Sequence, residues 1–214
     1  MEPTEDDRFT PDDADALSPE FFEARKRDLA GRVGKRRFAH SEGVSDTAAH
    51  LAEVYGADVA KARLAGILHD WDKGYGNEEV TGRARELAVE VDPYVLDTMP
   101  KVLHGLTAAA ALSRAYPQIP DDVIRAIAHH TEGAVDMTDL DMVVYIADAI
   151  EPHRDFAGVQ QIRDAVGKVC LEDLFLMTMG EVLDSLVRRR DRIHPGSVNV
   201  WNHYVTRAKS RGAY

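Results

Sequence analysis

Apolar residues recur at helical spacing along most of the chain. In residues 36–56 they occupy positions 38, 44, 48, 51, 52 and 55, which form one stripe of a helix that Gly56 would end. Ser18-Pro19-Glu20 has the form of a helix start, with Ser18 as the N-cap and Pro19 in the first turn. Alternation with a period of two residues is absent almost everywhere. We therefore expect an all-α fold.

The same pattern predicts further helices after residue 56. Residues 58–74 would form a helix that starts at Asp58 and ends at Gly74. The apolar run 143–146 (VVYI) could be a strand by itself, but the Asp residues before it and the Glu-Pro pair after it favour a helix. The other predicted helices are one or two short ones within 77–100, one each over 104–116, 121–132 and 139–151, a long one over about 160–190, and a short last one over 199–210 that follows the loop 193–198.

Length and composition indicate one domain. The chain has 214 residues, of which 44% are hydrophobic, so it can bury a core. Residues 1–17 are acidic, interrupted by proline and poor in apolar side chains. We expect them to form a flexible tail, followed by a single helical domain over 18–214 that includes the C-terminal helices.

Charge and cysteine content exclude several classes of protein. The formal net charge of −11 argues against loose binding to nucleic acid or to an anionic membrane, although a locally positive pocket could still hold a small anion. The single cysteine, Cys170, cannot form an internal disulfide, and its apolar surroundings predict a buried structural thiol. We find neither an apolar run of membrane-spanning length nor a signal-peptide pattern, so we expect a cytoplasmic protein.

Four ionisable residues lie in or at the end of apolar predicted helices: His40, His69, Asp70 and Asp148. Such groups are costly there unless they are paired or bind a metal. Neighbours on a helix point about 100° apart, so His69 and Asp70 could share an ion only with ligands from other helices. Imidazole and carboxylate together favour Fe, Mn, Zn, Co or Ni over Ca or Mg. Taken singly, each histidine could be merely hydrogen-bonded, and Asp148 could be a buried partner of an arginine.

Two more histidines stand at predicted helix ends. His104 begins the alanine-rich helix, and His130 ends the next one. A helix C-terminus favours histidine through its dipole, which would explain such a residue without any function. Beside a cluster of His and Asp, the two rings could instead bind a second ion or the phosphates of a substrate.

Several blocks of sequence resemble one known family. They are RFAHSEGV, AGILHDWDKG, LHG, AIAHHTEG, MTDLDMVVYIADAIEPHRDFAGV and IHPGSVNVWNHY, which together cover roughly residues 30–204. The order H…HD…D resembles that of the HD superfamily of phosphohydrolases, which implies an HD-domain helical bundle. The blocks HHTEG, ADAIEPHR and IHP more narrowly resemble those of the YqeK family of symmetrical diadenosine-tetraphosphate hydrolases. His129, Glu132, His153 and the acidic tail depart from that family's usual pattern.

The resemblance implies a role for each site residue. The metal ligands would be His40, His69, Asp70 and Asp148, holding one or two ions, with iron expected first. The catalytic residues would be Asp70, Lys73, His104 and His130. The substrate would contact Arg37, Lys73, His104, His130, Thr131, Arg154, Ile193 and His194. Arg37 is one turn before His40, and Lys73 is one turn after Asp70, whereas Arg36 should face solvent.

The expected reaction is hydrolysis of diadenosine tetraphosphate to two ADP. A bound metal would lower the pKa of its water, and Asp70 would bridge the ions if two are present. Two alternatives remain open at this point: another HD enzyme, either a 5′-nucleotidase or a (deoxy)nucleoside triphosphate phosphohydrolase, and a module that senses nucleotides without catalysis. The chain contains neither a phosphate-binding loop of the G-x-x-x-x-G-K-[ST] type nor a G-x-G-x-x-G motif. A homodimer is left open.

Overall fold

The computed structural model describes residues 15–212. At its centre, helix α2 (Lys35–Tyr55) packs against α3 (Val59–Leu68) and α8 (Asp139–Ile150). The packing of α2 on α3 is close, because a Cβ atom on Gly66 would lie 2.7 Å from the Cα atom of Ser45. No strand occurs in the described residues, and the predicted all-α class is confirmed.

Local capping explains where the central helices begin and end. Ser18 accepts a hydrogen bond from the Phe21 amide and starts α1 (Pro19–Arg32), as the sequence predicted. Asp58 accepts from the Lys61 amide and starts α3 in the same way. Gly56 ends α2 in the left-handed conformation, with φ at 79°. For α8, Thr138 and Asp141 form a reciprocal capping box, so the ambiguous run 143–146 is helical.

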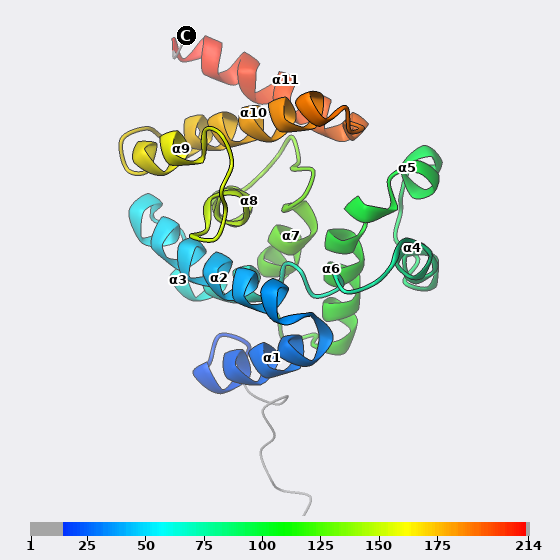
Figure 1. Ribbon diagram of the computed structural model, residues 1–214. Helices are drawn as coiled ribbons and strands as arrows, with labels where there is room; N and C mark the ends of the chain where they lie inside the picture. Colours follow the sequence, from blue (N-terminus) through cyan, green and yellow to red (C-terminus); the bar gives the residue numbers. More distant parts are fainter. Residues whose placement is uncertain (1–14, 213–214) are drawn as a thin grey trace, which may run out of the picture.

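The remaining helices cover the two sides of this centre. Figure 1 shows α10 and α11 on one side of α8, with α6 and α7 on the other side. A second, smaller core joins α4, α5 and the short helix η2 to the start of α6, and its buried residues are Val80, Ala84, Val95, Met99 and Leu103. The bounds are α4 (Asn77–Glu86), α5 (Pro93–Thr98), η2 (Pro100–Val102), α6 (His104–Ala115), α7 (Asp121–His129), α9 (Val159–Ala165), α10 (Leu171–Arg189) and α11 (Pro195–Ser210).

Three predicted helix boundaries are wrong. The long helix over 160–190 is interrupted between α9 and α10, where Gly167 has φ at 71° and the chain turns before Leu171. The last helix begins at Pro195, because proline fits the first helical position, so most of the predicted loop is helical. The helix over 58–74 stops at Leu68, which changes the geometry of the site described below.

The predicted tail and the predicted buried thiol also need correction. Residues 1–14 lie outside the described part of the chain, but Ala16 is only 2% exposed and belongs to the main core. The loosely attached segment therefore cannot extend to residue 17 as expected. Cys170 is exposed, because it is the N-cap of α10 and not a residue of a buried helix face. Within residues 15–212, no helix combines the length and the apolar character that crossing a bilayer requires.

Candidate active site

The turn after α3 presents two side chains to the centre of the molecule. His69 is the C-cap of the helix, and Asp70 already belongs to the following turn, in which the Lys73 amide donates to the Asp70 carbonyl at 3.0 Å. The prediction that His69 and Asp70 are neighbours on a helix is therefore wrong. Because the helix ends first, the two side chains can converge, with His69 Nε2 lying 3.4 Å from Asp70 Oδ2.

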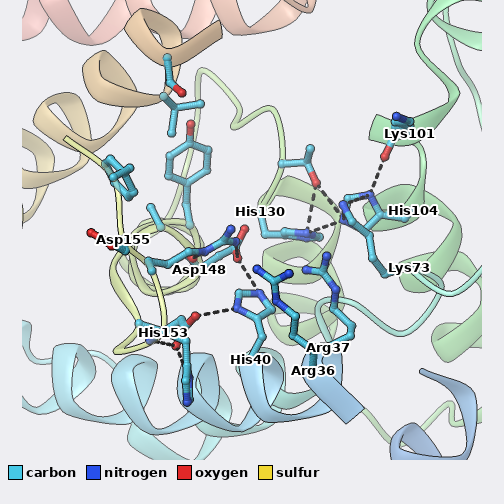
Figure 2. Close-up of a pocket in the computed structure, with 18 of the residues that line it drawn as sticks. Arg36, Arg37, His40, Lys73, Lys101, His104, His130, Asp148, His153 and Asp155 are labelled. Carbon is cyan, nitrogen blue, oxygen red and sulfur yellow. Dashed lines mark hydrogen bonds and ion pairs between the residues drawn. The ribbon is translucent and has the colours of Figure 1, made fainter. Parts of the chain in front are cut away.

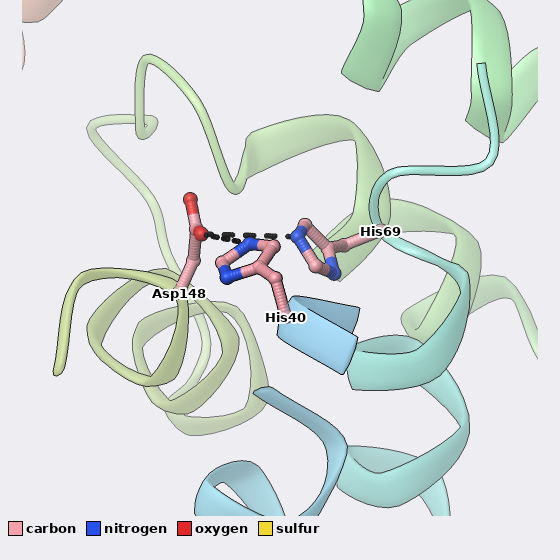
Figure 3. A group of neighbouring side chains, drawn as sticks. All are labelled: His40, His69 and Asp148. Atoms are coloured by element: carbon pink, nitrogen blue, oxygen red, sulfur yellow. Dashed lines mark ion pairs between the residues drawn. The ribbon is translucent and has the colours of Figure 1, made fainter. Parts of the chain in front are cut away.

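His40, His69 and Asp148 form the first group of candidate metal ligands (Figure 3). Asp148 Oδ1 lies 3.0 Å from His40 Nε2 and 3.8 Å from His69 Nε2. The three side chains come from α2, the end of α3 and α8, so the packing of these helices brings the ligands together. Each offers one donor atom to the same small space, as a mononuclear site requires.

Asp70 connects this group to a second one, which consists of His69, Asp70 and His130. Its Oδ2 atom lies 3.7 Å from His40 Nε2, whereas its Oδ1 atom lies 3.2 Å from His104 Nε2 and 4.0 Å from His130 Nε2. The carboxylate thus faces the first group with one oxygen and the His104–His130 pair with the other. Asp70 could therefore bridge two ions held by these groups, and His104 and His130 lie beside the predicted ligands.

The hydrogen bonds that the histidines make through Nδ1 turn their Nε2 atoms toward the two carboxylates. The Nδ1 atoms of His69, His104 and His130 lie 2.7, 3.0 and 2.7 Å from backbone carbonyl oxygens. A carbonyl only accepts, so each Nδ1 donates, and each ring in its neutral form turns a lone pair on Nε2 toward the centre. The Nε2 atoms of His40 and His69 are buried, and although carboxylate oxygens lie 3.0 and 3.4 Å from them, neither atom makes a hydrogen bond of acceptable geometry within the described residues. Two buried, unpartnered acceptors beside two carboxylates fit a divalent transition metal.

Three cations surround these carboxylates. Arg37 donates to Asp70 Oδ2 at 2.8 Å, and Arg154 donates to Asp148 Oδ1 at 2.5 Å. Lys73 Nζ lies 3.2 Å from His104 Nε2. Burial lowers the pKa of Lys73, although the nearby charges of Asp70 and Asp148 oppose this shift. Arg37, Lys73 and Arg154 are therefore where the sequence placed them, next to the ligands.

The electrostatics of the site favour charged carboxylates but shift the histidines in opposite directions. Burial lowers the pKa of His104 and His130, whereas the nearby charges of Asp70 and Asp148 raise the pKa of His69 although burial opposes this shift. Burial alone would raise the pKa of Asp70, but His69 and His104 hold that pKa well below its ordinary value. Burial similarly opposes the ionisation of Asp148, yet His40 and Arg154 keep its pKa well below the ordinary value. Burial lowers the pKa of His130 strongly, and the charges of His104 and His69 add to this effect. A neutral His130 keeps its lone pair available to a metal or to a proton.

His40, Asp148, His104 and His130 line a cavity of about 1300 Å³. Figure 2 shows Arg36, Arg37 and Lys73 beside His40 and His130 on one side of it. Thr131 also lines the cavity, as expected of a substrate contact. Arg36 is exposed, as predicted, but it also lines this cavity.

Two of the predicted substrate residues lie elsewhere. Ile193 and His194 are not among the residues that line the cavity. His194 is the N-cap of α11, and its Nδ1 accepts from the Gly196 amide at 3.1 Å. Its ring therefore has a structural role at the start of that helix.

Sequence reasoning missed Lys101 and Glu151, which also line the cavity. Lys101 comes from η2, and its position depends on the small second core. Glu151 follows α8 directly, three residues after Asp148, and its carboxylate lies 3.0 Å from His40 Nδ1. The spacing from Asp148, about one helical turn, was the only signal in the sequence that could have pointed to it.

Comparison with known proteins gives consistent matches. The model of the HD domain family matches residues 37–153. A Bacillus subtilis protein named symmetrical bis(5′-nucleosyl)-tetraphosphatase is 32% identical over 82% of this chain and 92% of its own length. A Staphylococcus aureus protein of the same name is 31% identical over 86% and 94%, respectively. The crystal structure of a predicted HD superfamily hydrolase involved in NAD metabolism, from Clostridium acetobutylicum, superposes with a TM-score of 0.81 at 30% identity, covering 87% of this chain and 97% of that one.

Proposed function

This chain belongs to the HD domain family, and from that premise we propose that it is a metal-dependent hydrolase that cleaves diadenosine tetraphosphate symmetrically into two ADP. The observation that carries the proposal is the convergence of two buried, unpartnered Nε2 atoms, those of His40 and His69, on the Asp148 carboxylate. The names of the relatives from B. subtilis and S. aureus give the substrate class.

His40, His69, Asp70 and Asp148 would hold the metal. Their nitrogen and carboxylate donors favour iron, manganese, cobalt, nickel or zinc, and we expect iron first. His69 and Asp70 also belong to the group with His130, so the site can accommodate one or two ions. When bound, such an ion supplies a water of lowered pKa and polarises a phosphoryl oxygen.

The side chains of this protein bind and orient the polyphosphate. Arg37 and Arg154 present guanidinium groups at the two ligand carboxylates, so phosphate oxygens placed there would meet two bidentate donors. Lys73 adds a compact charge beside His104. These three cations would neutralise the phosphates of one ADP half and leave the central bridge of the substrate at the ligand groups.

His104 and His130 are placed to take part in proton transfer at the reacting phosphate. Their Nε2 atoms face Asp70 Oδ1 at 3.2 and 4.0 Å, and the Thr131 hydroxyl lies 3.1 Å from His130 Nε2. Because burial lowers the pKa of both rings, they are neutral at neutral pH, and their Nε2 lone pairs can accept hydrogen bonds from a water or from a protonated phosphate oxygen. Arg37, Lys73 and Arg154 would stabilise the negative charge that develops on the leaving ADP.

A substrate panel with two histidine variants tests the proposal. The metal-loaded protein is incubated with diadenosine tetraphosphate, AMP and dATP, and we expect turnover of the first far above that of the others. His40→Ala should abolish this turnover. The matched control is His50→Ala, which removes an exposed histidine of the same helix and should leave turnover unchanged. Preferential release of phosphate from AMP or of triphosphate from dATP would instead assign a nucleotidase or a triphosphohydrolase, and binding without turnover would assign a sensor.

A further inference from the structure

His40 is held differently from the other three histidines of the site. The rings of His69, His104 and His130 stand at helix ends, and each donates from Nδ1 to the carbonyl three residues earlier in its own segment. His40 lies inside α2, where the backbone carbonyls already accept the hydrogen bonds of the helix. The Nδ1 proton of His40 therefore needs an acceptor from another part of the chain.

Glu151 supplies that acceptor. Its Oε1 atom lies 3.0 Å from His40 Nδ1, and its side chain is only 1% exposed. Its other oxygen, Oε2, accepts from the backbone amide of His153 at 2.7 Å and from His153 Nδ1 at 2.9 Å (Figure 2). Since both oxygens are used, the carboxylate cannot rotate without losing a hydrogen bond on one side.

Gly43 leaves the room that this carboxylate occupies. A Cβ atom built on Gly43 would lie 2.7 Å from Glu151 Oε2, well inside van der Waals contact. Glycine in the interior of a helix costs about 1 kcal/mol relative to alanine. Gly43 is one turn after His40 in α2. The helix therefore has a glycine, which destabilises it, at the position where the Glu151 carboxylate packs against it.

The backbone of Glu151 is fixed as well. Its amide donates to the Ala147 carbonyl at 3.0 Å, which ends α8. Arg163 donates to the Glu151 carbonyl at 2.7 Å and to the Ile150 carbonyl at 2.9 Å. One helix end thus provides a metal ligand, Asp148, and the residue that holds a second ligand.

We propose that Glu151 is a positioning residue for the metal site: it orients His40 and strengthens its Nε2 atom as a metal donor, and Gly43 and His153 keep the Glu151 carboxylate in place. A carboxylate that accepts from the second nitrogen of a ligating histidine fixes the ring and raises its basicity. The inference rests on the proposed function only in requiring that the site bind a metal.

Two substitutions test the proposal without changing a ligand. Glu151→Gln keeps nearly the same side-chain shape. If the amide oxygen faces His40, the NH₂ group faces the two donors of His153, so the hydrogen bonds on that side are lost. Gly43→Ala should keep the fold, because the atom it meets is the end of a flexible side chain, but it should displace the carboxylate. The matched control is Gly31→Ala, since a Cβ atom there meets nothing within 4 Å and the residue also lies inside a helix, α1.

The readouts are the affinity for Co(II), measured by competition with a chelator, and the visible spectrum of the cobalt-loaded protein. We expect Glu151→Gln and Gly43→Ala to weaken binding roughly 10–100-fold and to alter the spectrum, with Gly31→Ala like wild type. Wild-type affinity and spectrum in both Glu151→Gln and Gly43→Ala would overturn the role of Glu151 while leaving the metal site intact. A wild-type protein that binds no metal would overturn the proposed function as well.

Discussion

The Nε2 atoms of His104 and His130 lie 2.9 Å apart, although each ring already donates a proton from Nδ1 to a backbone carbonyl. Two neutral rings held in this way point lone pairs at each other, so the contact is not a hydrogen bond between them. The donors beside them are the Lys73 ammonium, 3.2 Å from His104 Nε2, and the Thr131 hydroxyl, 3.1 Å from His130 Nε2. The pair is therefore arranged to receive protons or a cation.

His104→Ala should lower the turnover of diadenosine tetraphosphate about 100-fold or more, the usual cost of losing one group that takes part in proton transfer. The ligand group of His40, His69 and Asp148 does not include His104, so metal bound there should remain. Turnover and metal content measured on the same preparation check this. Loss of all bound metal together with activity would contradict a separate role for His104.

Asp70→Asn should abolish both metal retention and turnover. The carboxylate lies within 4.0 Å of four histidine Nε2 atoms and accepts from Arg37. The amide has the same size but lacks the charge, and it cannot bridge two groups of ligands. We expect turnover to fall at least about 10³-fold, with metal content measured by elemental analysis falling in parallel. A variant with full metal content and more than a tenth of wild-type turnover would show that Asp70 is not a central ligand.

The sequence predicted the type of most helices, because helical periodicity and caps are local. It misplaced the end of α3, since nothing local stops a helix at Leu68 when residues 69–73 could continue it. It also missed Glu151, whose importance comes from a contact with His40 across a helix interface. The assignment of Ile193 and His194 to the substrate came from a resemblance of short blocks; neither residue lines the cavity, and their contact with a substrate stays a prediction.

Lys73→Ala should raise the KM for diadenosine tetraphosphate roughly 10–100-fold, because a hydrogen bond to a charged group contributes about 1.5–3 kcal/mol. The Lys73 side chain lies beside His104 and lines the cavity. Lys61→Ala is the control, since Lys61 pairs with Asp122 at the surface and does not line the cavity. An equal KM for the two variants in steady-state assays would remove Lys73 from phosphate binding.

Glu132→Gln should make stability less dependent on pH. Burial raises the pKa of Glu132 from 4.5 to about 7, and Oε1 has no hydrogen-bond partner within the described residues. Between pH 4.5 and 7 the folded protein therefore binds more protons than the unfolded chain. The stabilisation by the protonated Glu132 carboxyl group is fully present below pH 4.5 and is lost as pH rises through 7.

At pH 8 the glutamine variant should therefore be more stable than wild type, by up to about 3 kcal/mol, and near pH 4 the two should be similar. Thermal unfolding of both proteins across this range measures the difference. Parallel curves for the two proteins would mean that Glu132 ionises as an ordinary carboxyl group.

We expect this protein to cleave diadenosine tetraphosphate at its middle bridge. The most direct measurement is the chromatographic analysis of products formed early in the reaction by the metal-loaded enzyme. We predict that ADP is the sole nucleotide product, because Arg37, Lys73 and Arg154 would hold one ADP half while the ligand groups face the next phosphate. Equal amounts of ATP and AMP would contradict symmetrical cleavage.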